Sequence, residues 1–167
     1  SDADTLPTAP SLSVGTQPLG WGKVWLYYGS SEVGRQVTQG ANTFLRPVLA
    51  PGQDMFFCSN HRSELIVFDT LGNELSNLGY ADMESWGPQG QYILYCKTDY
   101  GHYDLEASDL WVAKFDGSEV RQLTDTPDVI ETGGVFSPSS MHLAYTNGRT
   151  GELYIVNLDS VAAGAER

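Results

Sequence analysis

Apolar and polar positions follow a pattern that repeats four times along the chain. Each copy is a run of β-branched and aromatic residues, then a turn, then a second, shorter strand pattern. The copies are residues 24–38, 65–79, 110–124 and 153–160, and their starts lie 41, 45 and 43 residues apart. A period of this length predicts the blades of an all-β propeller in place of one ordinary core.

A second repeating unit precedes the later copies. The units are residues 48–60, 85–98 and 135–147. Each has an apolar or aromatic residue two positions before a proline, then a polar turn, then an apolar strand. The proline fixes φ and lacks an N–H donor, which suits a tight turn between two strands. We expect Val48, Trp86 and Phe136 to occupy the same position in their units and to pack between blades.

The two repeating units together predict an incomplete ring of about three and a half blades, each complete blade having four antiparallel strands. The predicted parts are a flexible leader at 1–20, a partial blade at 22–45, blades at 46–79 and 80–126, a partial blade at 127–160 and a tail at 161–167. Partial blades leave strand edges unpaired, and soluble proteins cover such edges. The N-terminal segment LPTAPSLSVG could fill one edge, two chains could complete one ring, or the chain could be part of a longer protein.

The acidic composition limits the classes of partner. Nine Lys and Arg against 21 Asp and Glu give a net charge of −12 and a pI near 4.4. Such a surface repels phosphate backbones and anionic lipid, so no nucleic-acid or membrane-surface role is expected. No apolar run reaches the length that membrane insertion would need.

The two cysteines, Cys58 and Cys96, each follow the aromatic residue that ends a strand pattern. This places them at equivalent positions of successive blades, roughly 10 Å apart, which is too far for a disulfide without distortion. The alternatives are two reduced, half-buried thiols or a distorted Cys58–Cys96 bridge.

Three segments, WGPQGQYILY, GVFSPSSMHLAYTNGRTGELYIVNLD and DLWVAKFDGSEVRQLTDT, resemble the TolB-like β-propeller repeat, a WD40-like repeat also called PD40. The resemblance covers about residues 46–160 and, more loosely, 22–38. Two turns depart from the family's Pro-Asp-Gly pattern, at Pro88-Gln89-Gly90 and Pro138-Ser139-Ser140. The resemblance implies a bacterial periplasmic or secreted protein, and a non-catalytic module that binds or scaffolds a protein partner, or binds a glycan. The family also implies alternatives: the propeller portion of a metal-dependent polysaccharide lyase, or an accessory domain of a prolyl-oligopeptidase-like peptidase. A further alternative, from the incomplete ring, is a half-ring whose role is assembly.

The stretch from 97 to 109, KTDYGHYDLEASD, is the longest departure from the repeat. Insertions in propellers map to loops on one face, and such loops carry function. We therefore predict a protein-binding element whose contact residues are Tyr100, His102, Tyr103 and Asp104. Its carboxylates make Ca²⁺ an alternative ligand, although the spacing lacks the EF-hand order. The other alternative is a solvated acidic hairpin.

No catalytic or metal site is expected elsewhere. The chain has no G-x-S-x-G elbow, and neither cysteine has a nucleophile's setting. His61 and His102 are expected between second and third strands of a blade, and His142 between a first and a second. Those turns emerge on opposite faces, so joint metal coordination is not expected and no cofactor is predicted.

Two further repeated features have structural interpretations. Asn60 with Arg62, and Asn147 with Arg149, stand in equivalent turns, where an Arg fork would anchor one blade to the next. Trp25 and Trp111 are repeat-equivalent, as are Ile66 and Tyr154, and we expect these side chains in the core between blades.

Overall fold

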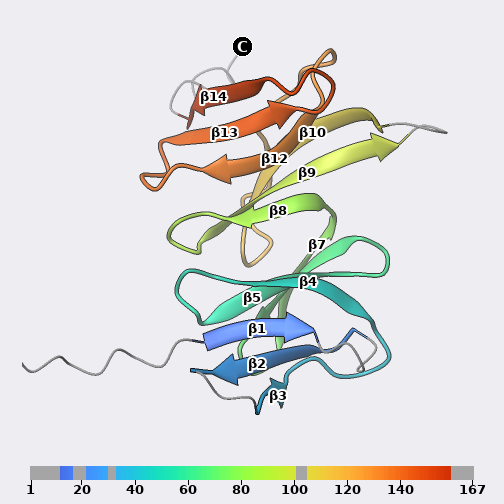
Figure 1. Ribbon diagram of the computed structural model, residues 1–167, viewed down its shortest axis with the longest axis vertical. Coiled ribbons are helices and arrows are strands. Elements are labelled where there is room, and N and C mark those ends of the chain that lie inside the picture. Colours follow the sequence, from blue (N-terminus) through green and yellow to red (C-terminus); the bar gives the residue numbers. More distant parts are fainter. Residues whose placement is uncertain (1–11, 17–21, 30–32, 101–104, 159–167) are drawn as a thin grey trace, which may run out of the picture.

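The strands form four antiparallel sheets in the computed structural model, which describes residues 12–16, 22–29, 33–100 and 105–158. The sheets follow one another along the longest axis of the molecule (Figure 1). The first sheet contains β1 (Leu12–Thr16), β2 (Val24–Tyr28) and β3 (Arg35–Gln36). The second contains β4 (Phe44–Leu49), β5 (Met55–Asn60), β6 (Glu64–Asp69) and β7 (Glu74–Tyr80). The third contains β8 (Asp82–Trp86), β9 (Tyr92–Tyr100), β10 (Leu105–Lys114) and β11 (Arg121–Gln122). The fourth contains β12 (Glu131–Phe136), β13 (His142–Asn147) and β14 (Leu153–Asn157).

Both faces of the middle sheets are apolar because each sheet has a neighbour on either side. We call the face toward the next sheet along the chain the forward face, and the opposite face the backward face. Side chains alternate between the two faces with a period of two. In β10, Leu110 and Val112 lie on the forward face and pack with the fourth sheet. Trp111 and Ala113 lie on the backward face and pack with the second sheet.

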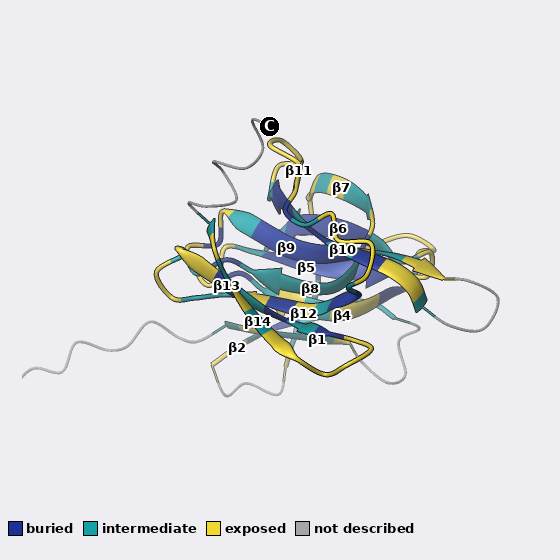
Figure 2. Cartoon of the chain, turned by 90° about the horizontal axis from the view of Figure 1, so that it is seen from above, coloured by how far each residue is buried: buried dark blue, intermediate teal, exposed yellow. Residues whose placement is uncertain are grey.

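The apolar core is divided into three clusters, one at each junction between neighbouring sheets. The buried members of the first are Val24, Leu26, Val37, Phe44, Phe56, Cys58, Ile66 and Phe68. Figure 2 shows the buried strands in the middle of the molecule, with more exposed strands in the fourth sheet. Each sheet is therefore stabilised mainly by the sheets beside it.

The inner strands β4, β8 and β12 share a β-bulge at the same position. The register with the partner strand shifts between Leu45 and Val48 in β4, and at the matching points of β8 and β12. The bulge residues Arg46, Met83 and Gly133 have positive φ, which is the left-handed region that bulges often use. This repeated kink turns the inner strands in the same way in three successive sheets.

The threonines that end the first and third copies of the sequence repeat hold equivalent positions. The Thr38 hydroxyl accepts a hydrogen bond from the Val24 amide at 2.9 Å, and the Thr124 hydroxyl accepts one from the Leu110 amide at 2.8 Å. Both amides lie in buried strands, where an unpaired donor is costly. The hydrophobic-Thr ending of the repeat thus satisfies the backbone of the third strand.

The predicted fold class is confirmed: two four-stranded antiparallel sheets, flanked by two three-stranded ones, form a partial propeller that is not closed into a ring. The strand β1 lies inside residues 1–20, which the sequence suggests as a flexible leader. It pairs with β2 and covers one edge of the first sheet, as one of the three arrangements proposes. The predicted tail, 161–167, lies outside the described residues.

Two predicted equivalences are wrong by one residue. The counterpart of Trp86 and Phe136 is Leu49, which packs against the first cluster, whereas Val48 is 41% exposed. Leu49 stands two positions before its proline, as Trp86 and Phe136 do. Because residues 48 and 49 are both apolar, the apolar pattern alone does not show which of them holds this position.

The cysteines are likewise not equivalent. Cys58 lies on the backward face of the second sheet and Cys96 on the forward face of the third, so they belong to different clusters. Both are free and fully buried, which confirms two reduced thiols but not their half-buried setting. Counting from the proline gives the correct register, whereas counting from the last aromatic residue does not.

Candidate functional site

The β9–β10 hairpin projects beyond the other hairpins of the molecule (Figure 1). Its strands have nine and ten residues, against six in each of β5 and β6. The turns between second and third strands lie on the same rim of the propeller, which we call the hairpin rim. The opposite rim, which we call the proline rim, carries the turns that follow Pro51, Pro88 and Pro138.

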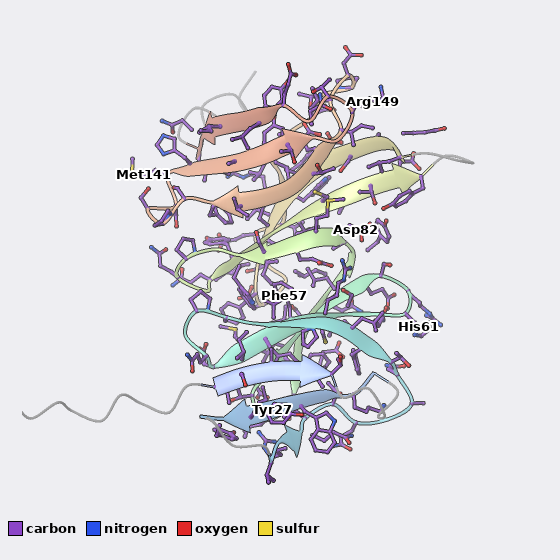
Figure 3. The ribbon with its side chains drawn as sticks, viewed as in Figure 1. Tyr27, Phe57, His61, Asp82, Met141 and Arg149 are labelled. Atoms are coloured by element: carbon purple, nitrogen blue, oxygen red, sulfur yellow. The ribbon has the colours of Figure 1, made fainter. Side chains whose placement is uncertain are left out.

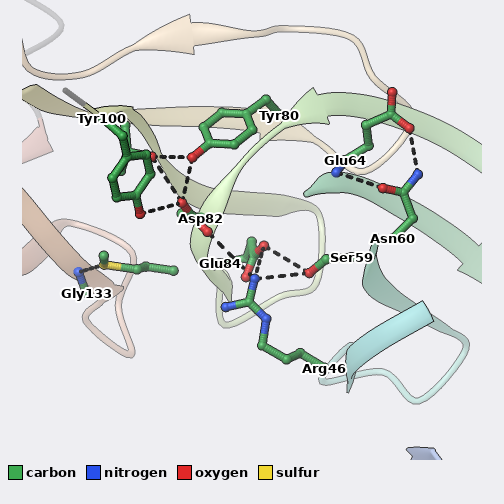
Figure 4. Close-up of polar contacts among 11 residues, drawn as sticks. Arg46, Ser59, Asn60, Glu64, Tyr80, Asp82, Glu84, Tyr100 and Gly133 are labelled. Atoms are coloured by element: carbon green, nitrogen blue, oxygen red, sulfur yellow. Dashed lines mark hydrogen bonds and ion pairs between the residues drawn. The ribbon is translucent and has the colours of Figure 1, made fainter. Parts of the chain in front are cut away.

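A carboxylate at the start of β8 anchors the base of this hairpin (Figure 4). One oxygen of Asp82 accepts hydrogen bonds from the hydroxyls of Tyr80 at 2.8 Å, Thr98 at 3.0 Å and Tyr100 at 3.2 Å. The donors come from two strands, β7 and β9, so the carboxylate links two sheets. Burial, and then the Asp82 carboxylate, raise the pKa of the Tyr80 hydroxyl to about 12, so it remains a donor.

A second polar group continues this network across the same junction. The Arg46 guanidinium lies 3.7 Å from the second oxygen of Asp82 and 3.5 Å from Glu84. The Glu84 carboxylate also accepts a hydrogen bond from the Ser59 hydroxyl at 3.4 Å. The Glu84 side chain is 4% exposed and that of Arg46 is 55% exposed. The pairing therefore supplies positive charge to an almost fully buried carboxylate.

The predicted binding residues fall partly within this site. Tyr100 is 58% exposed at the end of β9, with its hydroxyl bonded to Asp82. His102, Tyr103 and Asp104 lie outside the described residues. Asp99 and Glu106, the nearest described carboxylates of the hairpin, are exposed.

The positions of His61 and His142 agree with the predicted faces, whereas His102 lies outside the described residues. His61 lies on the hairpin rim, and His142, next to Met141, lies on the proline rim (Figure 3). Within the described ranges no three His, Cys, Asp or Glu side chains are grouped so that they could hold a metal ion. The Ca²⁺ alternative included Asp104 and stays a prediction.

The expected anchoring role of the repeated Asn-x-Arg turns is confirmed at one of the two turns, that of Arg149. The side-chain carbonyl of Asn60 accepts hydrogen bonds from the backbone amides of Arg62 at 2.8 Å and Glu64 at 3.1 Å. The side-chain carbonyl of Asn147 accepts one from the Arg149 backbone amide at 2.9 Å. The Arg149 guanidinium donates to the backbone carbonyl of Glu106 in the preceding sheet at 3.3 Å, so this Arg does anchor one blade to its neighbour.

The expected core positions are confirmed at three of four places. Ile66, Trp111 and Tyr154 pack in the first, second and third junction clusters. Trp25 occupies the same position in the first sheet, on its backward face, and belongs to none of these clusters. Its indole N–H is buried and has no hydrogen-bond partner among the described groups.

Neither thiol is suited to nucleophilic chemistry. Burial raises the pKa of Cys58 to about 12 and that of Cys96 to about 11. A thiol must ionise to act as a nucleophile, so both are inert at neutral pH.

A groove of about 620 Å³ opens between the third and fourth sheets at the proline rim. At the two preceding junctions an outer-strand side chain bonds a backbone carbonyl of the next sheet: Arg35 to Thr70, and Ser76 to Phe115. Arg121 and Leu158 occupy these positions at the third junction, and both line the groove. The groove therefore lies at the place where, at the other two junctions, the turn after the third strand of the next sheet contacts the preceding sheet.

Sequence reasoning missed the Asp82–Arg46–Glu84 network. Arg46 and Asp82 stand in inner strands whose bulges shift the register, so alternation of apolar and polar residues does not show which side chains meet. The one available signal was a pair of acidic residues, Asp82 and Glu84, directly before the repeating unit that begins at residue 85.

No protein-family model matches the sequence, and no curated protein matches it. Solved structures resemble the fold at low sequence identity. Tricorn protease aligns with a TM-score of 0.63 and 13% identity over 83% of this chain and 16% of its own. A TolB from Acinetobacter baumannii aligns with a TM-score of 0.59 and 14% identity over 85% of this chain and 37% of its own. A structure described as TolB from Agrobacterium tumefaciens gives 0.58 and 16% over 85% and 58%.

These likenesses concern the fold alone, and the chain spans less than two thirds of each of these proteins. Among the residues that the structure describes, no helix is long and apolar enough to cross a membrane. On the strand order, the repeated bulges and these neighbours together, the chain has the fold of a TolB-like β-propeller repeat.

Proposed function

We propose that the chain is a non-catalytic protein-binding module in which the β9–β10 hairpin is the contact element. The observation that carries the proposal is the projection of this hairpin beyond the hairpin rim, on a base held by the Asp82 network. A loop on a rigid propeller is positioned by the sheets beneath it. The scaffold supplies the position, and the loop supplies the recognition.

The side chains of the hairpin suit contact with a protein. Tyr100 is exposed, and Tyr103 stands three positions later in the sequence. Tyrosine contributes a large contact area with few rotatable bonds and is enriched at the centres of interfaces. Because the Asp82 carboxylate already orders the base, less conformational entropy is lost on binding. A glycan that stacks on these rings is the remaining class of ligand.

The likeness to tricorn protease favours a second candidate, the propeller portion of a peptidase. In that case the hairpin would contact another part of the enzyme or the entering substrate. The TolB-like fold supports a periplasmic or extracellular setting for either function.

A site-specific photo-crosslinker at position 100 tests the proposed function. We expect Tyr100→benzoylphenylalanine to form one discrete adduct with a protein of a periplasmic extract, and unlabelled wild-type chain to compete with it. The same crosslinker at Leu71, which is 72% exposed on the proline rim, is the control and should not form this adduct.

Asp82→Ala supplies the second arm of this experiment. With the crosslinker in place of Tyr100, this substitution removes the two remaining hydroxyl contacts, from Tyr80 and Thr98, and it should loosen the hairpin base and lower the adduct yield at position 100 several-fold. An equal adduct from positions 100 and 71, or an adduct that contains only two copies of this chain, would contradict the proposal.

A further inference from the structure

The forward face of the fourth sheet is exposed at positions that are buried in every other sheet. Leu153 and Ile155 of β14 are 67% and 71% exposed. The residues at the same two positions of the third sheet, Leu110 and Val112, are 0% and 7% exposed. The corresponding pairs are Leu65 with Val67 and Val24 with Leu26, all at 0%. In those three sheets a following sheet covers the pair.

The backward face of the first sheet has the complementary character. Trp25 stands at the position of Trp111 and Tyr154, whose rings pack against the sheet before them. Its buried indole N–H has no partner among the described groups. At the junction of the second and third sheets, by contrast, the Trp86 indole donates to the Val48 carbonyl of the preceding sheet at 3.0 Å. The first sheet thus has, where Trp111 and Tyr154 meet a preceding sheet, an aromatic residue whose buried donor has no partner among the described groups.

The end sheets also lack the charges that protect exposed strands. Their described strands carry two charged residues, Arg35 and Glu131, whereas the strands of the second and third sheets carry twelve. Glu131 is fully buried, so it does not protect the surface. Exposed sheet edges and faces in soluble proteins usually carry charged residues, because these oppose unwanted pairing. Their scarcity here indicates two faces that are covered in the functional state.

We propose that the forward face of the fourth sheet binds the backward face of the first sheet in a second copy of this chain. The contact repeats the packing at the three internal junctions, with small Ala144 and Thr146 facing the large rings of Trp25 and Tyr27. It is head-to-tail, so two copies cover all four faces only if the ring closes. The closed ring has eight sheets, which is within the four to eight blades typical of propellers.

Two lysine substitutions test this contact, one on each face. Ile155→Lys places a charge on the fourth sheet. Ser13→Lys places one on the first, because Ser13 is exposed on β1 directly opposite Tyr27. Leu71→Lys, in the β6–β7 turn, is the matched control on an exposed residue away from both faces. Circular dichroism verifies that each variant is folded.

Sedimentation across a range of micromolar concentrations is the readout. We expect the wild type and Leu71→Lys to approach twice the 18.2 kDa mass of one chain. Each of the other two variants should raise the dissociation constant at least tenfold, because each charge would be buried at the junction. A mass that stays at 18.2 kDa at every concentration overturns the proposal. A dimer weakened by Ile155→Lys but not by Ser13→Lys also overturns it, because that result would indicate a like-to-like contact. Neither result bears on the hairpin contact, which the crosslinker tests separately.

Discussion

Burial favours the neutral form of the Glu131 carboxyl and of the two cysteine thiols in this molecule. The Glu131 carboxyl is fully buried at the start of β12. One of its oxygens accepts a hydrogen bond from the Thr126 hydroxyl, and the other has no partner among the described groups. Burial raises the pKa of this carboxyl, because the charged form loses its hydration.

The Glu131 carboxyl should therefore make stability depend on pH. Its pKa in the folded chain lies above the ordinary value of 4.5, so the folded chain keeps the proton while the unfolded chain loses it. The stabilising contribution is present below pH 4.5 and is lost as pH rises through the folded pKa. We expect Glu131→Gln to raise the melting temperature at pH 7 by on the order of 2–4 °C and to change it little at pH 4. Glu74→Gln, exposed on β7, is the control; an equal effect there would contradict this account.

The two thiols give a second prediction about single residues. With a pKa of about 12 against an ordinary value of 9.0, Cys58 has roughly a thousandfold less thiolate in the folded chain. Iodoacetamide at pH 8 should leave Cys58 and Cys96 unmodified in the native protein and alkylate both in urea. Mass spectrometry counts the adducts, and rapid native alkylation of either thiol would show that its cluster opens.

Turns between the third and fourth strands illustrate the constraints on the elements. Gly72 has a φ of +95°, and a Cβ at this position would lie 2.1 Å from the Val37 carbonyl oxygen of the first sheet. The turn after β6 therefore seats against the backbone of the preceding sheet, and only glycine allows so close an approach.

Gly72→Ala should destabilise the protein by more than its dihedral angle alone requires. Gly79 has a similar φ of +74° with no atom within 4 Å of an added Cβ, so Gly79→Ala measures the cost of the angle, about 1–2 kcal/mol. We expect the Gly72 variant to cost at least about 1 kcal/mol more, because the first and second sheets must separate. Urea unfolding of both variants gives the difference, and equal costs would show that the turn relaxes freely.

Prediction from sequence succeeded at the level of elements and failed within them. The third strand of each blade could be found because its β-branched run repeats, as in VWLYY and LYIVN. The Asn60 and Arg149 turns could be interpreted because a polar pair recurs at one spacing. The Asp82 network could not, because it forms between strands whose bulges break the alternation of faces. Trp25 was expected in the core between blades, but it belongs to none of the three junction clusters.

At the scale of the whole molecule, charge and assembly oppose each other. Each chain carries a net charge of −12, so two copies repel at long range. The faces that we propose to meet are almost uncharged. The attraction is therefore apolar and acts at short range, whereas the repulsion acts over a distance that salt controls.

Added salt should accordingly tighten the proposed dimer. The screening length falls from about 10 Å at 0.1 M to about 3 Å at 1 M, and the repulsion between the two copies falls with it. We expect the dissociation constant from sedimentation to fall several-fold when the NaCl concentration rises from about 0.05 M to about 0.5 M. A dissociation constant that rises with salt would indicate a contact made by ion pairs, contrary to the face-to-face packing.

The apolar core is divided into three separate clusters, so each junction between sheets is stabilised largely independently of the others. A substitution at one junction weakens that junction and leaves the others almost unchanged, so damage stays local. Gain or loss of one repeat adds or removes a single junction without redesign of the remainder. A protein built this way can change its length in evolution at little cost, provided that whatever lies at its two ends still meets a matching face.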